Sequence, residues 1–283
     1  MLERPTTQRG SFTVLIAIAL VAAGSLAACS SRARGTSPTP TRSSASPLST
    51  EPSGYEALPI VALGDSDTTG SGDPTGIGWV GRYASLLQQK LGLQVRVTNL
   101  AVDGKTSDQL LSELRSDQTT RQDVANAEIV LIGIGGADLN AGDANLDAGT
   151  CEGKACYVPV LDRFGRNFDA IVAQVLALRS SPTVIRAITL PNGFPGAGTA
   201  FPPSATAEIS PYQATTQRDL ICRTMTKYGG RCVDVVRAFN GPSGTENAYK
   251  SGLMNKEDCC YPSAKGQQLI ADLLFKTGLA PIR

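Results

Sequence analysis

Short apolar segments alternate with longer amphipathic segments along most of the chain, and this alternation constrains the fold more than any other feature. The short segments are rich in valine and isoleucine and predict strands at 59–65, 95–102, 128–136, 183–191 and 231–239. The intervening segments carry apolar residues at helical spacing and predict helices at about 79–91, 107–116, 158–180, 211–228 and 263–277. Strands and helices in this order favour a parallel sheet covered on both faces.

In an open parallel sheet, functional sites form at the carboxyl ends of the strands. The loops after residues 64, 102 and 136 and the loop before residue 263 are therefore expected to converge. With 283 residues and 41% hydrophobic content, the chain can build one sizeable core, which we assign to a single domain at 55–283. A formal net charge of +1 gives no indication of a nucleic-acid partner, and we expect none.

The N-terminus has the pattern of a targeting signal. Arg4 and Arg9 precede the uncharged run "SFTVLIAIALVAAGSLAAC", whose apolar core is short for a membrane-spanning helix. Its last four residues, Leu-Ala-Ala-Cys, resemble the bacterial lipobox. That resemblance implies a signal peptide at 1–28 and a lipidated Cys29, and the alternative is an ordinary cleaved secretory signal.

Residues 29–54 are rich in serine, threonine and proline and contain almost no large apolar residue, so they predict a disordered stalk. The protein is then expected in the cell envelope. Its lipid would hold it on the outer side of the cytoplasmic membrane or on the outer membrane.

Six cysteines follow Cys29, and outside the cytoplasm an even set indicates disulfides. We favour Cys151–Cys156, which closes a small loop, and Cys222–Cys232, which brackets a Gly-Gly turn between a helix and a strand. The adjacent Cys259 and Cys260 are open to a vicinal bridge or to free thiols. Without histidine or paired CxxC spacing no zinc site is expected, and no cofactor is predicted.

Four sequence blocks lie in the loops that should converge. They read "GDSDTTGSG" at 64–72, "NLAVDGKTSDQLL" at 99–111, "GIGGADL" at 133–139 and "DCCYP" at 258–262. Their order and spacing resemble those of the SGNH (GDSL) hydrolases, over residues 58–278. The resemblance implies a three-layer α/β/α fold of flavodoxin-like type with a five-stranded parallel sheet, and a serine ester hydrolase activity.

Carried over to this sequence, the resemblance makes Ser66 the nucleophile and its backbone N–H one oxyanion donor. Gly104 would offer the second donor, since a residue without Cβ lets the backbone approach closely. The family's third donor is an asparagine side chain, and Ala137 stands in its place. In the last block, Asp258 matches the family's aspartate, while Tyr261 occupies the position of the catalytic histidine.

The chain contains no histidine at all, so the base that should activate the serine is missing. A tyrosine phenol is almost entirely protonated at neutral pH and is a poor substitute. Lys105 and Asp67 are the two alternative bases that the neighbouring sequence offers.

Two functions are therefore consistent with the sequence. The first is a lipid-anchored, catalytically impaired protein that binds a small acylated or glycan-like ligand. The second is an active ester hydrolase or acyltransferase with a base other than histidine.

Overall fold

The structure, a computed structural model, describes residues 57–194, 206–257 and 260–282. The expected signal peptide, Cys29 and the stalk lie outside the described residues, as do Asp258 and Cys259. Within the described part, no helix is long and apolar enough to cross a membrane.

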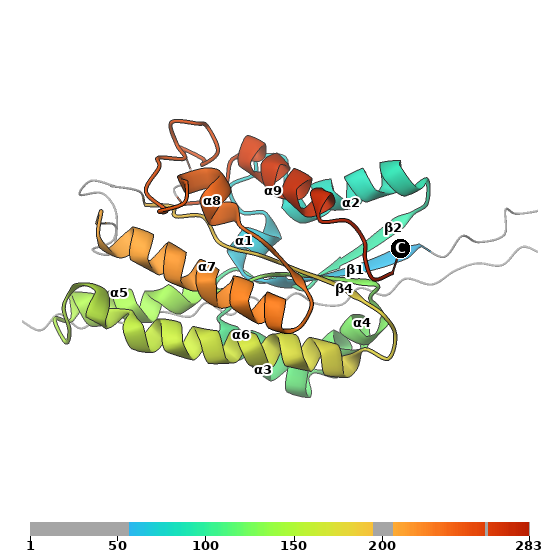
Figure 1. Cartoon of the computed structure of the whole chain (residues 1–283), viewed down its shortest axis with the longest axis horizontal. Coiled ribbons are helices and arrows are strands. Elements are labelled where there is room, and N and C mark those ends of the chain that lie inside the picture. The colour runs from blue at the N-terminus through green and yellow to red at the C-terminus, as the bar shows by residue number, and fades with distance from the viewer. Residues whose placement is uncertain (1–56, 195–205, 258–259, 283) are drawn as a thin grey trace, which may run out of the picture. The chain divides into compact units, whose positions relative to one another are not determined.

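One five-stranded, all-parallel sheet forms the centre of the domain (Figure 1). Its strands are β1 (Leu58–Gly64), β2 (Val95–Asn99), β3 (Ile129–Gly133), β4 (Val184–Ile188) and β5 (Arg231–Val233), in the spatial order β2-β1-β3-β4-β5. Every neighbouring pair is parallel. Strands β3 and β4 are buried along their whole length, because both faces of the sheet are covered. The predicted fold class is confirmed.

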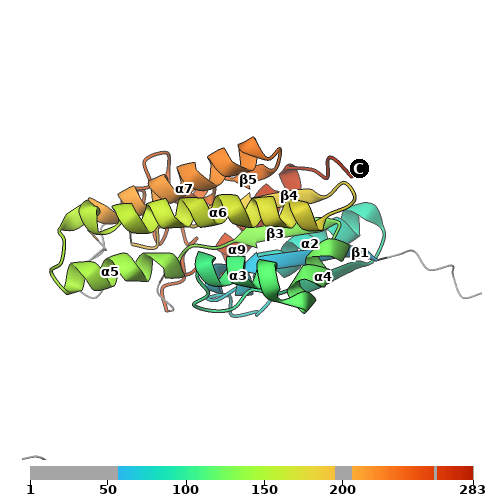
Figure 2. The same cartoon turned by 90° about the horizontal axis from the view of Figure 1, so that it is seen from below.

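Helices cover both faces of the sheet, as Figures 1 and 2 show. Those packed on one face include α2 (Gly78–Leu91), α8 (Val235–Asn240) and α9 (Ala264–Lys276). The other face carries α3 (Ser107–Ser116), α4 (Gln118–Asn126), α6 (Val158–Leu178) and α7 (Ile209–Lys227). Shorter elements follow strand ends or lie in connections: α1 (Ser66–Thr69), α5 (Asn140–Asp147) and the 3₁₀ turns η1 (Ala137–Leu139) and η2 (Gly153–Cys156).

Each face of the sheet has its own apolar core, and β1 contributes to both by simple alternation. Leu58 and Ile60 pack with Trp79 against α2 and α9, whereas Val61 and Leu63 pack against α3 and α6. Because successive side chains of a strand point to opposite faces, one apolar run supplies both cores. Trp79 is fully buried in the first core.

The last predicted strand was too long. The segment expected to be a strand at 231–239 forms the short strand β5 and then turns into helix α8. Asp234 causes the change, because its side chain accepts a hydrogen bond from the backbone N–H of Arg237 and caps the helix. The apolar residues that follow are buried at helical spacing.

Both predicted disulfides are confirmed. Cys151 bonds to Cys156, and Cys222 of α7 bonds to Cys232 of β5. Cys260 is also disulfide-bonded, so it is not a free thiol.

Candidate active site

A cavity of about 400 Å³ opens where the loops after β1, β2, β3 and β4 meet the loop before α9. Six residues singled out from the sequence line it together: Ser66, Asp67, Gly104, Ala137, Cys260 and Tyr261. The structure therefore brings the four sequence blocks to one place, and Asp258 lies outside the described residues. Residues outside the four sequence blocks also line the cavity, namely Asn140, Asp143, Leu190, Pro191, Asn192, Gly193, Phe194, Ser210, Gln213, Ala214 and Gln217.

Ser66 is the first residue of α1, directly after the turn that ends β1. The turn is tight, since a Cβ on Gly64 would lie 2.0 Å from the carbonyl oxygen of Gly133. In the described part of the chain, neither the Oγ nor the backbone N–H of Ser66 makes a hydrogen bond. Both groups are therefore available to a ligand in the cavity.

Asp65 fixes the loop after β1 to the loop after β3. Its Oδ2 accepts hydrogen bonds from the backbone N–H groups of Gly135 and Gly136, each at 2.9 Å, and its Oδ1 accepts from the N–H of Asp67 at 3.2 Å. Burial raises the pKa of Asp65 to about 6, although these N–H donors oppose the rise. The carboxyl group thus holds two of the four site loops in a fixed relation.

Gly104 lies in a left-handed conformation with φ of +75°, and a Cβ there would meet no atom within 4 Å. Its backbone N–H donates to no acceptor among the described residues, as for Ser66.

The next residue, Lys105, is buried and does not line the cavity. Its Nζ donates to the carbonyl oxygen of Leu100 at 2.9 Å and to Glu113 at 2.7 Å. The hypothesis that Lys105 replaces the histidine is therefore wrong, because the ammonium group is engaged in a structural ion pair.

The aspartate of the third block ties η1 to α3. Asp138 accepts hydrogen bonds from the N–H of Ser107 at 2.9 Å and from its hydroxyl at 2.5 Å, and Asn167 donates to the same hydroxyl at 2.9 Å. Burial raises the pKa of Asp138, against the opposing effect of the Ser107 donors. Beside it, Ala137 presents a methyl group to the cavity, which cannot donate a hydrogen bond.

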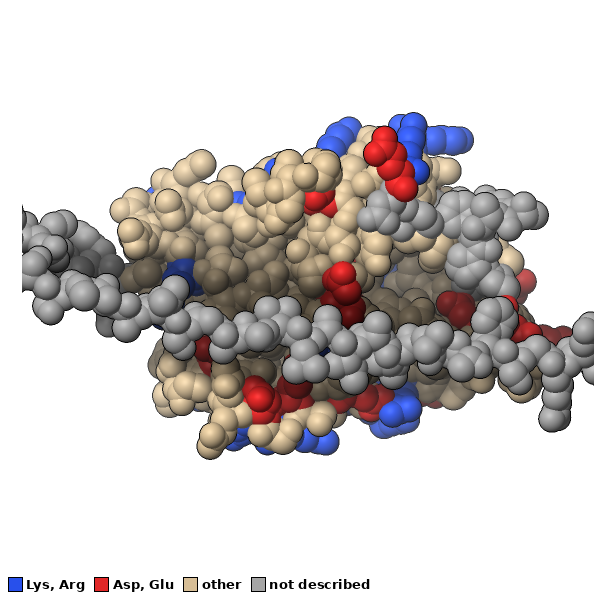
Figure 3. All heavy atoms as spheres, turned by 180° about the vertical axis from the view of Figure 1, so that it is seen from behind, with Lys and Arg blue, Asp and Glu red and all other residues tan. Residues whose placement is uncertain are grey.

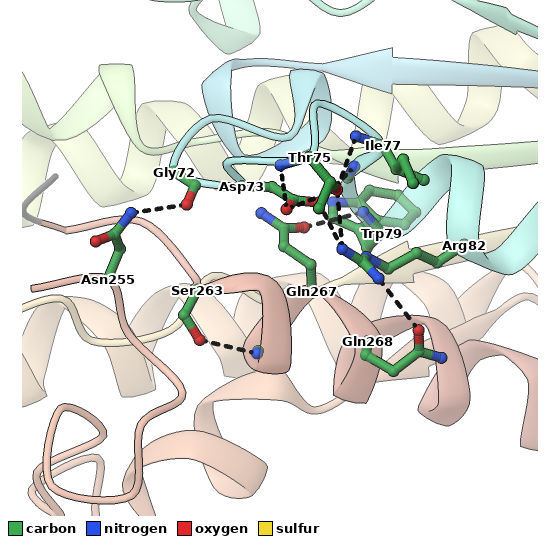
Figure 4. A network of polar contacts seen from close by, with 12 residues as sticks. Gly72, Asp73, Thr75, Ile77, Trp79, Arg82, Asn255, Ser263, Gln267 and Gln268 are labelled. Atoms are coloured by element: carbon green, nitrogen blue, oxygen red, sulfur yellow. Dashed lines mark hydrogen bonds and ion pairs between the residues drawn. The ribbon is translucent and has the colours of Figure 1, made fainter. Parts of the chain in front are cut away.

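Tyr261 is positioned through its backbone and its Cβ. Its carbonyl oxygen accepts from the N–H of Asn255 at 2.9 Å, and the Asn255 amide donates to the carbonyl oxygen of Gly72 at 2.8 Å (Figure 4). A Cβ on Gly72 would lie only 2.4 Å from the Cβ of Tyr261. Two residues on, Ser263 caps α9 through a hydrogen bond from Gly266 N–H.

A polar network anchors the Ser66 loop to α2 and α9, and Figure 4 shows its side chains pointing toward one another. The indole N–H of Trp79 donates to the Asp67 backbone carbonyl oxygen at 2.8 Å. The backbone N–H of Trp79 donates to the side-chain amide oxygen of Gln267 at 2.9 Å. Asp73 pairs with Arg82 at 2.9 Å and accepts from Gly78 N–H. Burial acts to raise the pKa of Asp73, but its hydrogen bonds outweigh burial and hold the pKa below the usual value.

The remaining carboxyl group at the site belongs to Asp67. It lines the cavity, and its Oδ1 is buried without a hydrogen-bond partner in the described part. Burial, and after it the charge of Asp65, raises the pKa of Asp67 well above the ordinary value. Among the described residues, no three cysteine, aspartate or glutamate side chains are grouped to hold a metal ion.

On the face shown in Figure 3, acidic and basic side chains are dispersed among larger uncharged areas. None of the described residues that line the cavity is a lysine or an arginine. The cavity is thus better suited to a neutral group than to an anionic one.

The fold and the cavity together define an α/β protein with the architecture of a serine hydrolase. The sheet is parallel, the serine follows its first strand, and Ser66 and Gly104 line the same cavity. The chain belongs to the GDSL-like Lipase/Acylhydrolase family, whose model matches residues 62–269.

Solved structures share this fold at low sequence identity. The lipase Lip_vut3 from a goat rumen metagenome aligns with a TM-score of 0.67 and 17% identity, over 80% of this chain and 100% of that one. An extracellular lipase from Streptomyces rimosus aligns with a TM-score of 0.54 and 18% identity, over 78% and 100% of the two chains. A catalytic mutant of the acetylxylan esterase Axe2 from Geobacillus stearothermophilus aligns with a TM-score of 0.54 and 18% identity, over 77% of this chain and 93% of that one.

A relative of higher identity is the uncharacterized protein YpmR of Bacillus subtilis. It is 44% identical over 85 residues, which are 30% of this chain and 33% of that protein. The match thus spans about a third of the relative's length.

Proposed function

We propose that the cavity binds the acyl group of a small ester, such as an acylated glycan, and that the protein hydrolyses it very slowly or not at all. One observation carries the proposal. Ser66 and Gly104 line the cavity, and their backbone N–H groups donate to no acceptor among the described residues. Tyr261 lines the same cavity at the position that the family resemblance gives to the catalytic histidine, and the chain contains no histidine. The groups that bind a carbonyl are kept, and the base is lost.

The two missing groups differ in their expected cost. Loss of one oxyanion donor, here the amide absent at Ala137, lowers turnover by about 10²–10³. Loss of a member of a serine triad lowers it by on the order of 10⁴–10⁶, and the two effects do not simply add. The absent base therefore dominates, and with Lys105 held by Glu113 the nearest cationic substitute is not available.

Turnover of short-chain aryl esters tests this function. Purified residues 55–283 should hydrolyse an aryl acetate at pH 7 little faster than buffer, because Ser66 lacks an effective base. Ser66→Ala should leave that residual rate almost unchanged. A robust rate that Ser66→Ala abolishes would instead establish the alternative, an active ester hydrolase or acyltransferase with an unusual base.

The N-terminal sequence supports a location for this binding protein. We propose that Cys29 is lipidated after cleavage of residues 1–28, and that residues 29–54 separate the domain from the membrane in the cell envelope. Cys29→Ser should then release the protein into the soluble fraction when cells are lysed and membranes are sedimented. Membrane association that persists in Cys29→Ser would refute lipid anchoring at this residue.

A further inference from the structure

Asp67 has an unusual environment for a carboxyl group. Its Oδ1 is buried and has no hydrogen-bond partner in the described part of the chain, and the residue lines the cavity. Its Oδ2 lies 3.8 Å from the point that a Cβ on Gly136 would occupy, and Oδ2 of Asp65 lies 3.5 Å from the same point. Two carboxyl groups therefore flank one backbone position, next to Ala137.

Two such groups so near each other do not both ionise readily, and their hydrogen bonds decide which one keeps a proton. Asp65 accepts three backbone N–H donors, which stabilise its carboxylate. The Oδ1 of Asp67 accepts no hydrogen bond from the described residues. The ionised form is therefore favoured at Asp65 and the acid form at Asp67.

The other titratable groups around Asp67 do not favour its ionisation. Asp138 lies beyond Gly136, and Asp143 and Tyr261 stand on the cavity walls. The lining residues of the described part include no cation that would stabilise a second carboxylate. A protonated carboxyl group has one O–H donor, and carboxylic acids kept neutral by their surroundings act as oxyanion donors in other proteins.

We infer that Asp67, as a carboxylic acid, donates a hydrogen bond to the carbonyl oxygen of an ester in the cavity, in place of the amide that Ala137 lacks. The inference rests on the proposed function and adds a third donor to the N–H groups of Ser66 and Gly104. Asp67 follows Ser66 directly, and its Oδ2 lies near Gly136, the residue before Ala137. The Asp67 carboxyl group therefore lies on the side of the cavity where the amide donor is missing.

A boronic acid tests the donor without requiring turnover. Phenylboronic acid adds to a serine Oγ: the B–O bond forms, the hydroxyl proton passes to solvent, and the boron hydroxyl oxygens occupy the oxyanion position. Its affinity is measured at pH 7 for the detergent-solubilised full chain, for Ser66→Ala, and for two variants of Asp67. Asp67→Asn keeps a donor of similar shape, and Asp67→Leu removes it.

We expect Asp67→Asn to bind within about threefold of wild type and Asp67→Leu to bind about 10- to 100-fold more weakly, the value of one hydrogen bond to a charged group. Equal affinities for Asp67→Leu and wild type would overturn the inference while leaving the proposed cavity intact. If Asp67→Asn weakens binding as much as Asp67→Leu does, the acid is not a simple donor and the inference also fails. No detectable binding of phenylboronic acid to either wild type or Ser66→Ala would refute the proposed function itself, and this inference with it.

A second measurement reads the proton directly. In protein labelled with ¹³C at the aspartate carboxyl carbons, the Asp67 signal is the one missing from Asp67→Asn. That signal should report a protonated group at pH 7 and should shift when phenylboronic acid binds. A signal that reports an ionised Asp67 at pH 7 would overturn the inference whatever the affinities show.

Discussion

Gly72 is the residue whose size most directly sets the position of Tyr261. It adopts φ of +80°, and the Cβ of Tyr261 occupies the space that a side chain on Gly72 would need. The carbonyl oxygen of Gly72 also accepts the Asn255 hydrogen bond that holds the same loop. Tyr261 is thus placed by a glycine in the loop that follows Ser66.

The variants Gly72→Ala and Gly76→Ala separate this contact from backbone strain. Gly76 lies in the same loop with φ of +66°, but a Cβ there would meet nothing within 4 Å. Both variants should lose about 1 kcal/mol of unfolding free energy because alanine disfavours positive φ. Gly72→Ala should lose about 1–3 kcal/mol more, since the new methyl group overlaps Tyr261. Urea denaturation measures both, and equal losses would contradict the packing described here.

For single residues, the sequence predicted which side chains converge at the cavity, but it did not predict the pKa shifts of their carboxyl groups. Ser66, Gly104, Ala137 and Tyr261 were expected together because parallel strands bring their carboxyl-end loops to one edge. The raised pKa of Asp67 was not predictable from the sequence. It depends on the backbone N–H groups of Gly135 and Gly136, which donate to Asp65 and not to Asp67.

At the scale of elements, the central strands and long helices followed from apolar periodicity, since both depend on burial against the sheet. The short elements did not. Helix α8 contains valine and phenylalanine, which suit a strand equally well, and the Asp234 cap decides for helix. Helices α1 and α5 are too short to show a helical repeat of apolar residues, so the sequence did not predict them. Both contribute residues to the cavity lining.

For the whole molecule, the buried carboxyl groups predict how stability depends on pH. Folding raises the pKa of Asp65 to about 6 and raises that of Asp67 well above its ordinary value, so between about pH 4 and these raised pKa values the folded protein binds more protons than the unfolded chain. Stability must therefore fall as pH rises through this window. Asp73, with a lowered pKa, loses its contribution only below about pH 4.

Urea midpoints of the full chain should consequently be highest at about pH 4–5 and decline toward pH 8. Asp67→Asn should decline less steeply above pH 6, because its amide does not titrate. A wild-type midpoint that rises steadily from pH 5 to pH 8 would show that these carboxyl groups are not destabilised by folding.

We propose that the protein keeps a carbonyl-binding cavity and lacks the catalytic base. Restoring the histidine and the oxyanion amide by substitution tests this proposal. Tyr261→His should place an imidazole between Asp258 and Ser66, the arrangement of a triad, and Ala137→Asn should add an amide donor to the oxyanion position. The measurement is aryl-acetate hydrolysis at pH 7 by wild type, by each single variant, by the double variant, and by the double variant carrying Ser66→Ala.

We expect activity to appear with Tyr261→His and to increase with Ala137→Asn by up to about 10²–10³, and we expect Ser66→Ala to abolish it. Circular dichroism controls for the fold of each variant. A correctly folded double variant that hydrolyses the ester no faster than wild type would contradict the account.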